Sequence, residues 1–334
     1  MISECLEKYI LGKSSQISRD AGIDSHFDLF IFCCGWESRC TEILNHDKGK
    51  FQFNSAAIMS FKIESDLGYD NKYMEQLISF STSKTKKMTL LENESTDLDS
   101  ITHDIDEMVS DLVKEMGRPI YVGFDMTCCP RFVFLYFLGY CLRTGAAKEI
   151  SFFYSEGIYG TSPKEYVHTK GSWKIMEIPG FEAWEYKLNK KLFVVSAGWE
   201  GSRYRSIVAK YEPDSLGILL PNPGFTSEYA YKSREECNPL IEEYNLGNDA
   251  IVSATAGDAI AAWQALKVPS LNKQDHHIAY LTFGPKPHSL GMGIRGFLYD
   301  TISVIYRIPE EYIKIEVEPN GIFWRYDIKN LLII

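Results

Sequence analysis

The sequence lacks an apolar run long enough to cross a membrane. Its most apolar stretch, Phe132 to Leu142, is about half of the roughly 20 residues that a spanning helix needs, and Gly139 interrupts it. The opening segment, MISECLEKYILGKSSQ, shows no basic leader followed by an apolar run and a small-residue cleavage site. We therefore expect a cytoplasmic protein without a membrane partner, in which Phe132 to Leu142 forms a buried helix.

Clustered positive charge is also missing. The formal net charge is −10, and Lys and Arg form no basic block. A groove that binds long DNA or RNA needs many cations close together, because binding depends on the release of counterions from the phosphates. Long nucleic acid is therefore not expected as a partner. A small anionic ligand needs only a few converging cations, so the composition is compatible with one.

The common enzyme motifs are absent as well. There is no Walker sequence, no Gly-x-Gly-x-x-Gly fingerprint, no His-Glu-x-x-His helix and no Gly-x-Ser-x-Gly elbow. The eight cysteines lack the Cys-x₂-Cys spacing of zinc folds, so we expect no metal and reduced, structural cysteines. Cys33 and Arg39 have the spacing of a phosphocysteine phosphatase loop, but Glu37 lies between them and would repel a bound phosphate. No cofactor can be assigned.

The most informative feature that is present is an internal duplication. FDLFIFCCGWESRCTEIL, from Phe27 to Leu44, matches KLFVVSAGWEGSRYRSIV, from Lys191 to Val208. Each copy contains an apolar strand, the triplet Gly-Trp-Glu, a basic residue and a helix-like stretch. A length of 334 residues is also typical of two domains rather than one. The chain therefore contains two copies of one plan.

A second pair of segments follows in the same order. These are YVGFDMTCCPRFVFLYFLGY, from Tyr121, and IAYLTFGPKPHSLGMGIRGF, from Ile278. Pro130 follows Gly35 at nearly the distance at which Pro287 follows Gly198. Further strands are predicted at 54–61, 149–155, 214–221, 250–256 and 312–317, and helices at 100–116, 131–143 and 259–266.

Short apolar runs that alternate with polar helical segments predict parallel sheets covered by helices. The predicted fold class is α/β, with two tandem Rossmann-like units that have mainly parallel sheets and are related by a pseudo-two-fold axis. We place the first unit at residues 1–185 and the second at 186–334, because Gly160, Pro163, Gly171 and Pro179 lie between the two copies.

Ligands of open parallel sheets bind beyond the carboxyl ends of the strands, where both repeated motifs are expected. Trp36 and Trp199 offer faces for stacking on a base, or they pack against their own domain. Arg39 and Arg203 can hold a phosphate or carboxylate, or they pair with Glu37 and Glu200 and brace each loop. The two glutamates suit a ribose hydroxyl, a base edge, a metal, or general acid and base catalysis.

The loops of the second pair add further candidates. Asp125, Thr127 and Arg131 belong to the first copy, and Lys286 and His288 to the second. Lys286 and His288 precede a predicted helix, whose N-terminus favours anions, although His288 also suits a helix cap or a surface position. Asp258 is expected to cap the helix that follows it.

The run from Tyr121 to Arg131, a strand that ends in Asp-x-Thr and opens a helix, resembles the ligand loop of the CRISPR-associated Rossmann (CARF) sensors. Two such units in one chain resemble their fused relatives, the SAVED domains of bacterial antiphage signalling. The resemblance covers the loops near Asp125 to Arg131 and Gly284 to His288. It implies a Rossmann-like core that binds cyclic or linear oligonucleotides across a two-fold or pseudo-two-fold junction. The Gly-Trp-Glu loops are not part of that pattern.

Three functional hypotheses follow. The first is a nucleotide-binding sensor or subunit of a bacterial antiphage defence system, whose ligand can be an oligonucleotide second messenger and which passes a signal to a partner protein. The second is a nucleotide hydrolase or glycosidase that uses Glu37 or Glu200. The third is a non-catalytic adaptor that binds a partner protein. For the first, the ligand is expected in one composite site between the two halves, and the ligand-binding candidates are Trp36, Arg39, Asp125, Thr127, Arg131, Trp199, Arg203, Lys286 and His288.

Overall fold

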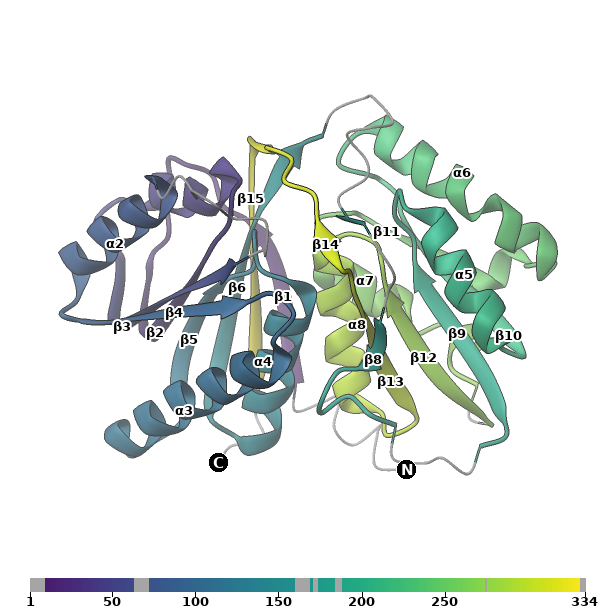
Figure 1. The fold of residues 1–334 in the computed structure, drawn as a ribbon, viewed down its shortest axis with the longest axis horizontal. Coiled ribbons are helices and arrows are strands. Elements are labelled where there is room, and N and C mark those ends of the chain that lie inside the picture. Colours follow the sequence, from purple (N-terminus) through teal and green to yellow (C-terminus); the bar gives the residue numbers. More distant parts are fainter. Residues whose placement is uncertain are drawn as a thin grey trace. The chain divides into compact units, whose positions relative to one another are not determined.

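The computed structural model describes residues 10–62, 72–159, 169–170, 174–183, 188–273 and 275–330. The chain forms two compact units (Figure 1). The first unit combines Lys8–Ser172 with Pro309–Ile334, and the second unit comprises Trp173–Ile308. The end of the chain therefore belongs to the first unit, whereas the boundary predicted from the sequence, between residues 185 and 186, places it in the second.

The first unit contains a seven-stranded sheet in the order β1-β15-β6-β5-β2-β3-β4. Five neighbouring strands are parallel, while β15 is antiparallel to β6, and β1 is antiparallel to β15. The strands are β1 (Ile10–Gln16), β2 (Ser25–Cys34), β3 (Phe51–Lys62), β4 (Lys87–Glu94), β5 (Ile120–Asp125), β6 (Ala147–Ile158) and β15 (Glu318–Asn330).

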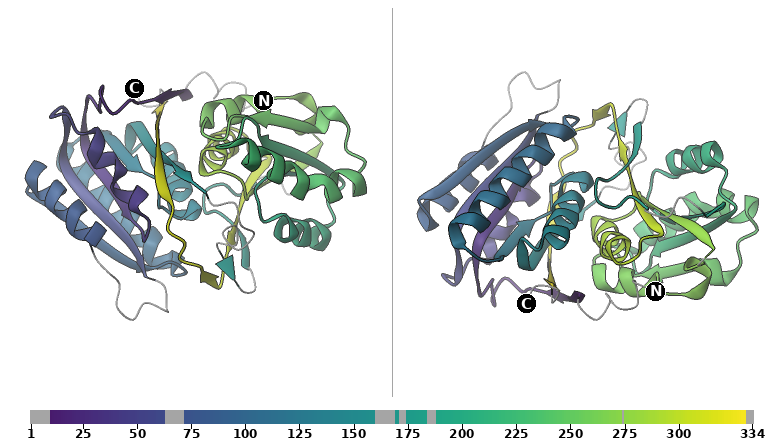
Figure 2. Two further views of the ribbon diagram at one scale, coloured as in Figure 1. Left: turned by 90° about the horizontal axis from the view of Figure 1, so that it is seen from above. Right: turned by 90° about the horizontal axis from the view of Figure 1, so that it is seen from below.

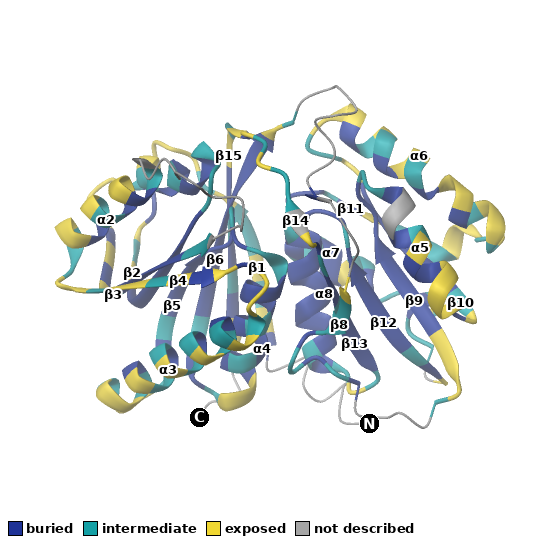
Figure 3. Cartoon of the chain, viewed as in Figure 1, coloured by how far each residue is buried: buried dark blue, intermediate teal, exposed yellow. Residues whose placement is uncertain are grey.

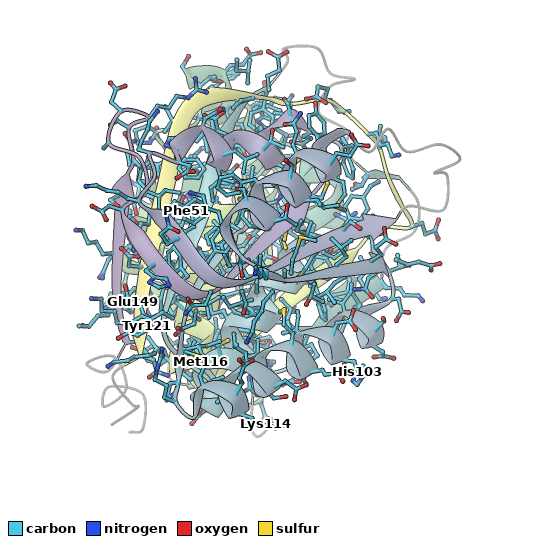
Figure 4. All side chains as sticks on the ribbon, turned by 90° about the vertical axis from the view of Figure 1, so that its left-hand side faces the viewer. Phe51, His103, Lys114, Met116, Tyr121 and Glu149 are labelled. Atoms are coloured by element: carbon cyan, nitrogen blue, oxygen red, sulfur yellow. The ribbon has the colours of Figure 1, made fainter. Side chains whose placement is uncertain are left out.

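Helices cover both faces of this sheet (Figure 2). The 3₁₀ helix η1 (Ser38–His46) contacts α2 (Lys72–Lys84), and α3 (Leu98–Met116) contacts α4 (Arg131–Thr144). Figure 4 shows His103 and Lys114 on the outer side of α3, where both are exposed. The opposite side of α3 buries Ile101 and Ile105, so this helix follows the amphipathic pattern expected of a covering helix.

The second unit contains a six-stranded sheet in the order β11-β10-β9-β12-β13-β8, in which all strands but β8 are parallel. The strands are β8 (Lys174–Glu177), β9 (Lys190–Ser196), β10 (Ser215–Pro221), β11 (Ile251–Ala254), β12 (His276–Thr282) and β13 (Ile302–Ile308). Its α-helices are α5 (Gly201–Tyr211), α6 (Ser227–Glu243), α7 (Ala259–Ala265) and α8 (Lys286–Leu298).

The two units share one topology, which confirms the predicted α/β, Rossmann-like fold class. When the five parallel strands of each unit are numbered along the chain, both sheets have the order 3-2-1-4-5. The strand order reverses between β2 and β5 in the first unit, and between β9 and β12 in the second. These are the topological switch points at which doubly wound sheets bind ligands. The pseudo-two-fold relation between the units stays a prediction.

The central strands are buried on both faces, as parallel strands require (Figure 3). From Phe27 to Cys34 every residue of β2 is buried, and so is every residue of β9 from Leu192 to Ser196. This burial explains why these strands were recognisable as continuous apolar runs. No helix among the described residues is long and apolar enough to cross a membrane.

Most predicted elements are confirmed with small shifts at their ends. One strand prediction is wrong: of residues 312–317, only Tyr312 lies in a strand, the two-residue β14 (Glu311–Tyr312), which pairs with β7 (Thr169–Lys170). The proline match also needs correction. The structural counterpart of Pro130 is Pro285, because each precedes the helix that follows the fourth strand, whereas Pro287 lies inside α8.

Candidate ligand sites at the two switch points

The repeated loops meet at the switch point of each unit. A side chain at Gly35, directly after β2, would place its Cβ 2.7 Å from Cβ of Cys128 in the loop after β5. A side chain at Gly198, after β9, would place its Cβ 2.8 Å from the carbonyl oxygen of Phe283 in the loop after β12. In both units the glycine of the Gly-Trp-Glu triplet is therefore required by the close approach of two loops.

The helices at the switch points start differently from the α-helices α3, α6 and α7. Asp97, Thr226 and Asp258 cap α3, α6 and α7 by accepting hydrogen bonds from backbone N–H groups. The N-cap residues of η1, α4, α5 and α8 provide no such bond from their side chains. These four helices follow the first and fourth strands, where a ligand is expected. The short 3₁₀ helices η3 (Asn248–Ala250) and η4 (Pro269–Leu271) also start without a side-chain cap, so the contrast holds for the capped α-helices α3, α6 and α7 only.

Two of these helices begin in the same unusual way. Pro130 and Pro285, which have nearly identical backbone angles, precede Arg131 and Lys286 at the first helical position. A cation at this position is disfavoured by the positive end of the helix dipole. The same proline and cation at equivalent places in both units are a feature that the two switch points share. Both cations are candidates in the sequence, but only the structure shows that they are counterparts.

A buried hydroxyl lies at the second switch point. Ser196, the last residue of β9, is fully buried, and its Oγ has no hydrogen-bond partner among the described residues. A Cβ at Gly284 would collide with this hydroxyl, so Ser196 faces the loop that leads into α8. A buried polar group without a partner is costly, and such groups in native proteins indicate a functional role or an absent ligand. Nothing in the sequence singles out Ser196.

The two tryptophans have different surroundings. The indole nitrogen of Trp36 donates a hydrogen bond to the carbonyl oxygen of Ile315 at 3.1 Å. Trp199 instead packs on Tyr229 with ring centroids 4.6 Å apart, and Tyr229 packs edge-on against Phe225. Trp199, Tyr229 and Phe225 form an aromatic cluster beside the loops that follow β9 and β10.

Arg39 is buried and paired inside its own unit. Its Nε donates to a Glu37 carboxylate oxygen at 2.8 Å, Nη2 donates to the same oxygen, and Nη1 donates to the carbonyl oxygen of Ser155 at 3.1 Å. Burial alone would lower the pKa of Arg39, but the Glu37 carboxylate and Tyr159 raise it above its ordinary value. Arg39 therefore braces the loop, and Glu37 is engaged. The side chain of Arg203 lies outside the described residues, and Glu200 is partly exposed.

Asp125 and Thr127 fasten the loop after β5. An Asp125 carboxylate oxygen accepts a hydrogen bond from the Thr127 backbone N–H at 2.9 Å. The Thr127 hydroxyl accepts one from the Ser155 backbone N–H at 3.0 Å. Both side chains are almost fully buried. These contacts shape the loop that presents Arg131, so the two residues act on the site through the backbone.

His288 lies inside the second unit and not on a ligand surface. It is fully buried, and its Nε2 lies 3.1 Å from the carbonyl oxygen of Thr255 in the loop after β11. Burial lowers the pKa of His288 to about 4. The imidazole is therefore neutral near pH 7, which removes the positive charge that an anion contact requires.

The cysteines near the first switch point are free thiols. Cys33 is buried, which leaves its thiol inaccessible as a phosphatase nucleophile. A hydrogen bond with Cys40 and burial raise the pKa of Cys128 well above its ordinary value. The thiol form is stable at neutral pH for this reason, as expected of structural cysteines.

Fold and site together define a tandem Rossmann-like α/β protein with one switch point in each unit. No protein-family model matches the chain. No curated protein matches it either. Two solved structures are similar at 10% identity and a TM-score of 0.24, covering 84% of this chain and 92% of theirs. They are a protein of unknown function from Pseudomonas aeruginosa PAO1 and a candidate universal stress protein from Pseudomonas aeruginosa UCBPP-PA14. This level of similarity carries no functional argument.

Proposed function

We propose that the chain binds a nucleotide at the switch point of its second unit, and that it serves as a sensor or subunit of a bacterial antiphage defence system. The observation that carries the binding proposal is the start of α8. Pro285 supplies no side-chain cap there, and Lys286 follows at a position that the helix dipole makes unfavourable for a cation. A bound phosphate would relieve that repulsion and accept hydrogen bonds from the backbone N–H groups at the start of α8.

The second unit offers more contacts for such a ligand than a single helix end. The N-cap residue of α5 also lacks a side-chain cap, and α5 follows β9 as α8 follows β12. The buried Ser196 hydroxyl lies at the end of β9 and is able to donate one hydrogen bond. Together these groups favour an anion at the carboxyl ends of β9 and β12.

A nucleotide suits the site better than a simple anion because aromatic and acidic groups lie nearby. The cluster of Trp199, Tyr229 and Phe225 offers a stacking surface for a base. Glu200, directly after Trp199, is partly exposed and can accept a hydrogen bond from a ribose hydroxyl. A carboxylate there disfavours a second phosphate, which supports a ligand that presents phosphate to α8 and sugar to α5.

The sensor role rests on the resemblance to the CARF and SAVED families. The alternative of a hydrolase is weakened for Glu37, whose carboxylate accepts two hydrogen bonds from the buried Arg39, and therefore depends on Glu200. A carboxylate fixed in this way is poorly placed to move a proton to or from a substrate.

Native mass spectrometry of the protein purified from its own host tests the proposal. We expect a mass increment that denaturation releases as a nucleotide, and we expect the Lys286→Gln variant to lose it. Lys190→Gln is the matched control, since Lys190 opens β9 at the opposite end of the same sheet and pairs with Asp275 on the surface. A ligand-free wild-type chain that copurifies with another protein would contradict the proposal and favour the adaptor hypothesis.

A further inference from the structure

We infer that residues Tyr312–Val317 form an internal clamp on the Gly-Trp-Glu loop of the first unit, and that an anionic ligand releases it by displacing Glu316. This inference rests on the proposed function and extends it, because it takes the same phosphate-bearing nucleotide to bind also at the switch point of the first unit. The clamp belongs to the connection between β13 of the second unit and β15 of the first. Its release would therefore alter the segment that links the two units.

The clamp is fastened to the loop by contacts of several kinds. The Glu316 carboxylate accepts a hydrogen bond from the Ser38 backbone N–H, the first of η1, at 2.7 Å. The Ile315 carbonyl accepts one from the Trp36 indole at 3.1 Å. Val317 is buried and packs directly on Gly157 of β6.

Glu316 occupies the place that an anion would take. The Glu37 side chain does not cap η1, and the start of this helix is satisfied instead by a carboxylate from far along the chain. A carboxylate on a helix N-terminus makes the same contacts as a phosphate oxygen. The first unit thus carries its own negative group at the end of β2, where a ligand is expected in an open doubly wound sheet.

The contact is suited to exchange. Glu316 is exposed, and the carboxylate is held to η1 by one hydrogen bond, so water or a stronger acceptor can reach the Ser38 N–H. The Glu37 carboxylate would repel an incoming phosphate, but its pairing with Arg39 offsets that charge. A phosphate with two or more acceptor oxygens and a higher charge would compete with the single carboxylate.

Limited proteolysis reads the state of the clamp directly. Trypsin cleaves after Lys314, which is exposed and lies within the clamp. The cleavage rate should be measured relative to the same bond in urea-unfolded chain, which corrects for the preference of trypsin for each sequence. We expect Glu316→Gln to raise this relative rate about fivefold without ligand, the shift expected for one charge-assisted hydrogen bond at a surface. Trp36→Phe, which removes the bond to Ile315, should raise it as well.

Glu318→Gln is the matched control, because Glu318 is an exposed neighbour at the start of β15. With ATP as the probe, cleavage of wild type should accelerate and cleavage of Glu316→Gln should not change further. Equal rates in Glu316→Gln and Glu318→Gln would overturn the clamp. ATP binding in calorimetry without faster cleavage of wild type would overturn ligand-driven release and leave the proposed function standing. Faster cleavage of Glu316→Gln in a chain that binds neither ATP nor the nucleotide released from the native protein would contradict the proposed function and ligand-driven release but support the clamp.

Discussion

At the scale of single residues, burial decides which charged side chains are available to a ligand. The sequence identified Arg39, His288 and Lys286 by their charge and their place after a strand. In the structure Arg39 and His288 are buried and engaged, while Lys286 is partly exposed at a helix start. The sequence cannot separate these cases, because the partners of the buried pair include backbone carbonyls of Ser155 and Thr255 that are distant in sequence.

His288 makes the stability of the protein depend on pH. Its pKa is lowered from 6.5 to about 4, so the folded state stays neutral while the unfolded state takes up a proton as the pH falls below 6.5. The contribution of His288 to the free energy of unfolding is fully present above pH 6.5 and is lost as the pH falls towards 4. We expect a loss of roughly 2 kcal/mol between pH 7 and pH 5.

Urea unfolding of wild type and His288→Gln at both pH values measures this contribution. The variant should lose that part of the pH dependence, whereas His26→Gln, which changes an exposed histidine, should keep it. An equal pH dependence in wild type and His288→Gln would show that the imidazole is not held neutral.

Arg39 is expected to support the first unit strongly. Arg39→Met removes the buried guanidinium and leaves the Glu37 carboxylate, of which 14% is exposed, without its partner. The expected loss is roughly 3 to 5 kcal/mol in the free energy of unfolding. Lys50→Met removes an exposed pair with Asp24 and should cost less than about 1 kcal/mol. Similar losses in both variants, measured by urea unfolding, would contradict the bracing role.

At the scale of elements, the α-helices with a polar side-chain cap differ from the α-helix at the proposed ligand site. The caps of α6 and α7 are Thr226 and Asp258, as the sequence predicted for Asp258. The starts of α4 and α8 carry a proline and a cation instead. A polar cap is recognisable in a sequence because its side chain acts locally, whereas a helix that is capped by a ligand shows only the absence of a cap.

This difference gives opposite predictions for two nearby helices. Asp258→Ala should destabilise the ligand-free protein by about 1 kcal/mol through loss of the α7 cap. Lys286→Gln should leave stability unchanged or raise it by a few tenths of a kcal/mol, because it removes a cation from the positive end of α8. Thermal unfolding of the ligand-free variants checks both. Destabilisation of the same size by Lys286→Gln would show that Lys286 has a structural role.

Sequence patterns predicted the parallel strands except β4 and β13, and they missed the antiparallel strands β1, β8 and β15. The central strands β2 and β9 are buried on both faces, and they contain the continuous apolar runs Leu29–Cys34 and Leu192–Val195. The long strand β15 has both exposed and buried residues, and it contains charged residues and a glycine. It therefore lacks the continuous apolar run by which buried parallel strands are recognised. Residues 313–317 alternate like a strand, but they contact the loop of η1 through Ile315 and Glu316.

At the scale of the whole molecule, the duplication predicted the architecture but not the path of the chain. The two copies of the motif predict two consecutive domains. In the structure the first unit is instead completed by a strand from the C-terminal segment. β15 pairs with both β1 and β6, so it is an integral strand of the first sheet. Only long-range pairing specifies this arrangement, and a local pattern does not contain it.

Truncation tests this organisation. A chain that ends at Ile308 lacks β15, so the first unit should lose its cooperative unfolding transition while the second unit keeps its own. Hydrogen exchange should become fast in β2 and β5 and remain slow in β9 and β12. A chain that ends at Asn330 retains β15 and should exchange like wild type. Slow exchange in β2 after truncation at Ile308 would contradict the assignment of β15 to the first unit's stable fold.

The central claim is that the second switch point binds a nucleotide through the start of α8. Isothermal titration calorimetry with ATP as the probe, on wild type, Lys286→Gln and Lys190→Gln, tests it most directly. The account predicts binding to wild type, an affinity at least about tenfold weaker for Lys286→Gln, and no change for Lys190→Gln. Equal affinity in wild type and Lys286→Gln would contradict it. So would a wild-type chain that binds neither ATP nor the nucleotide released from the native protein.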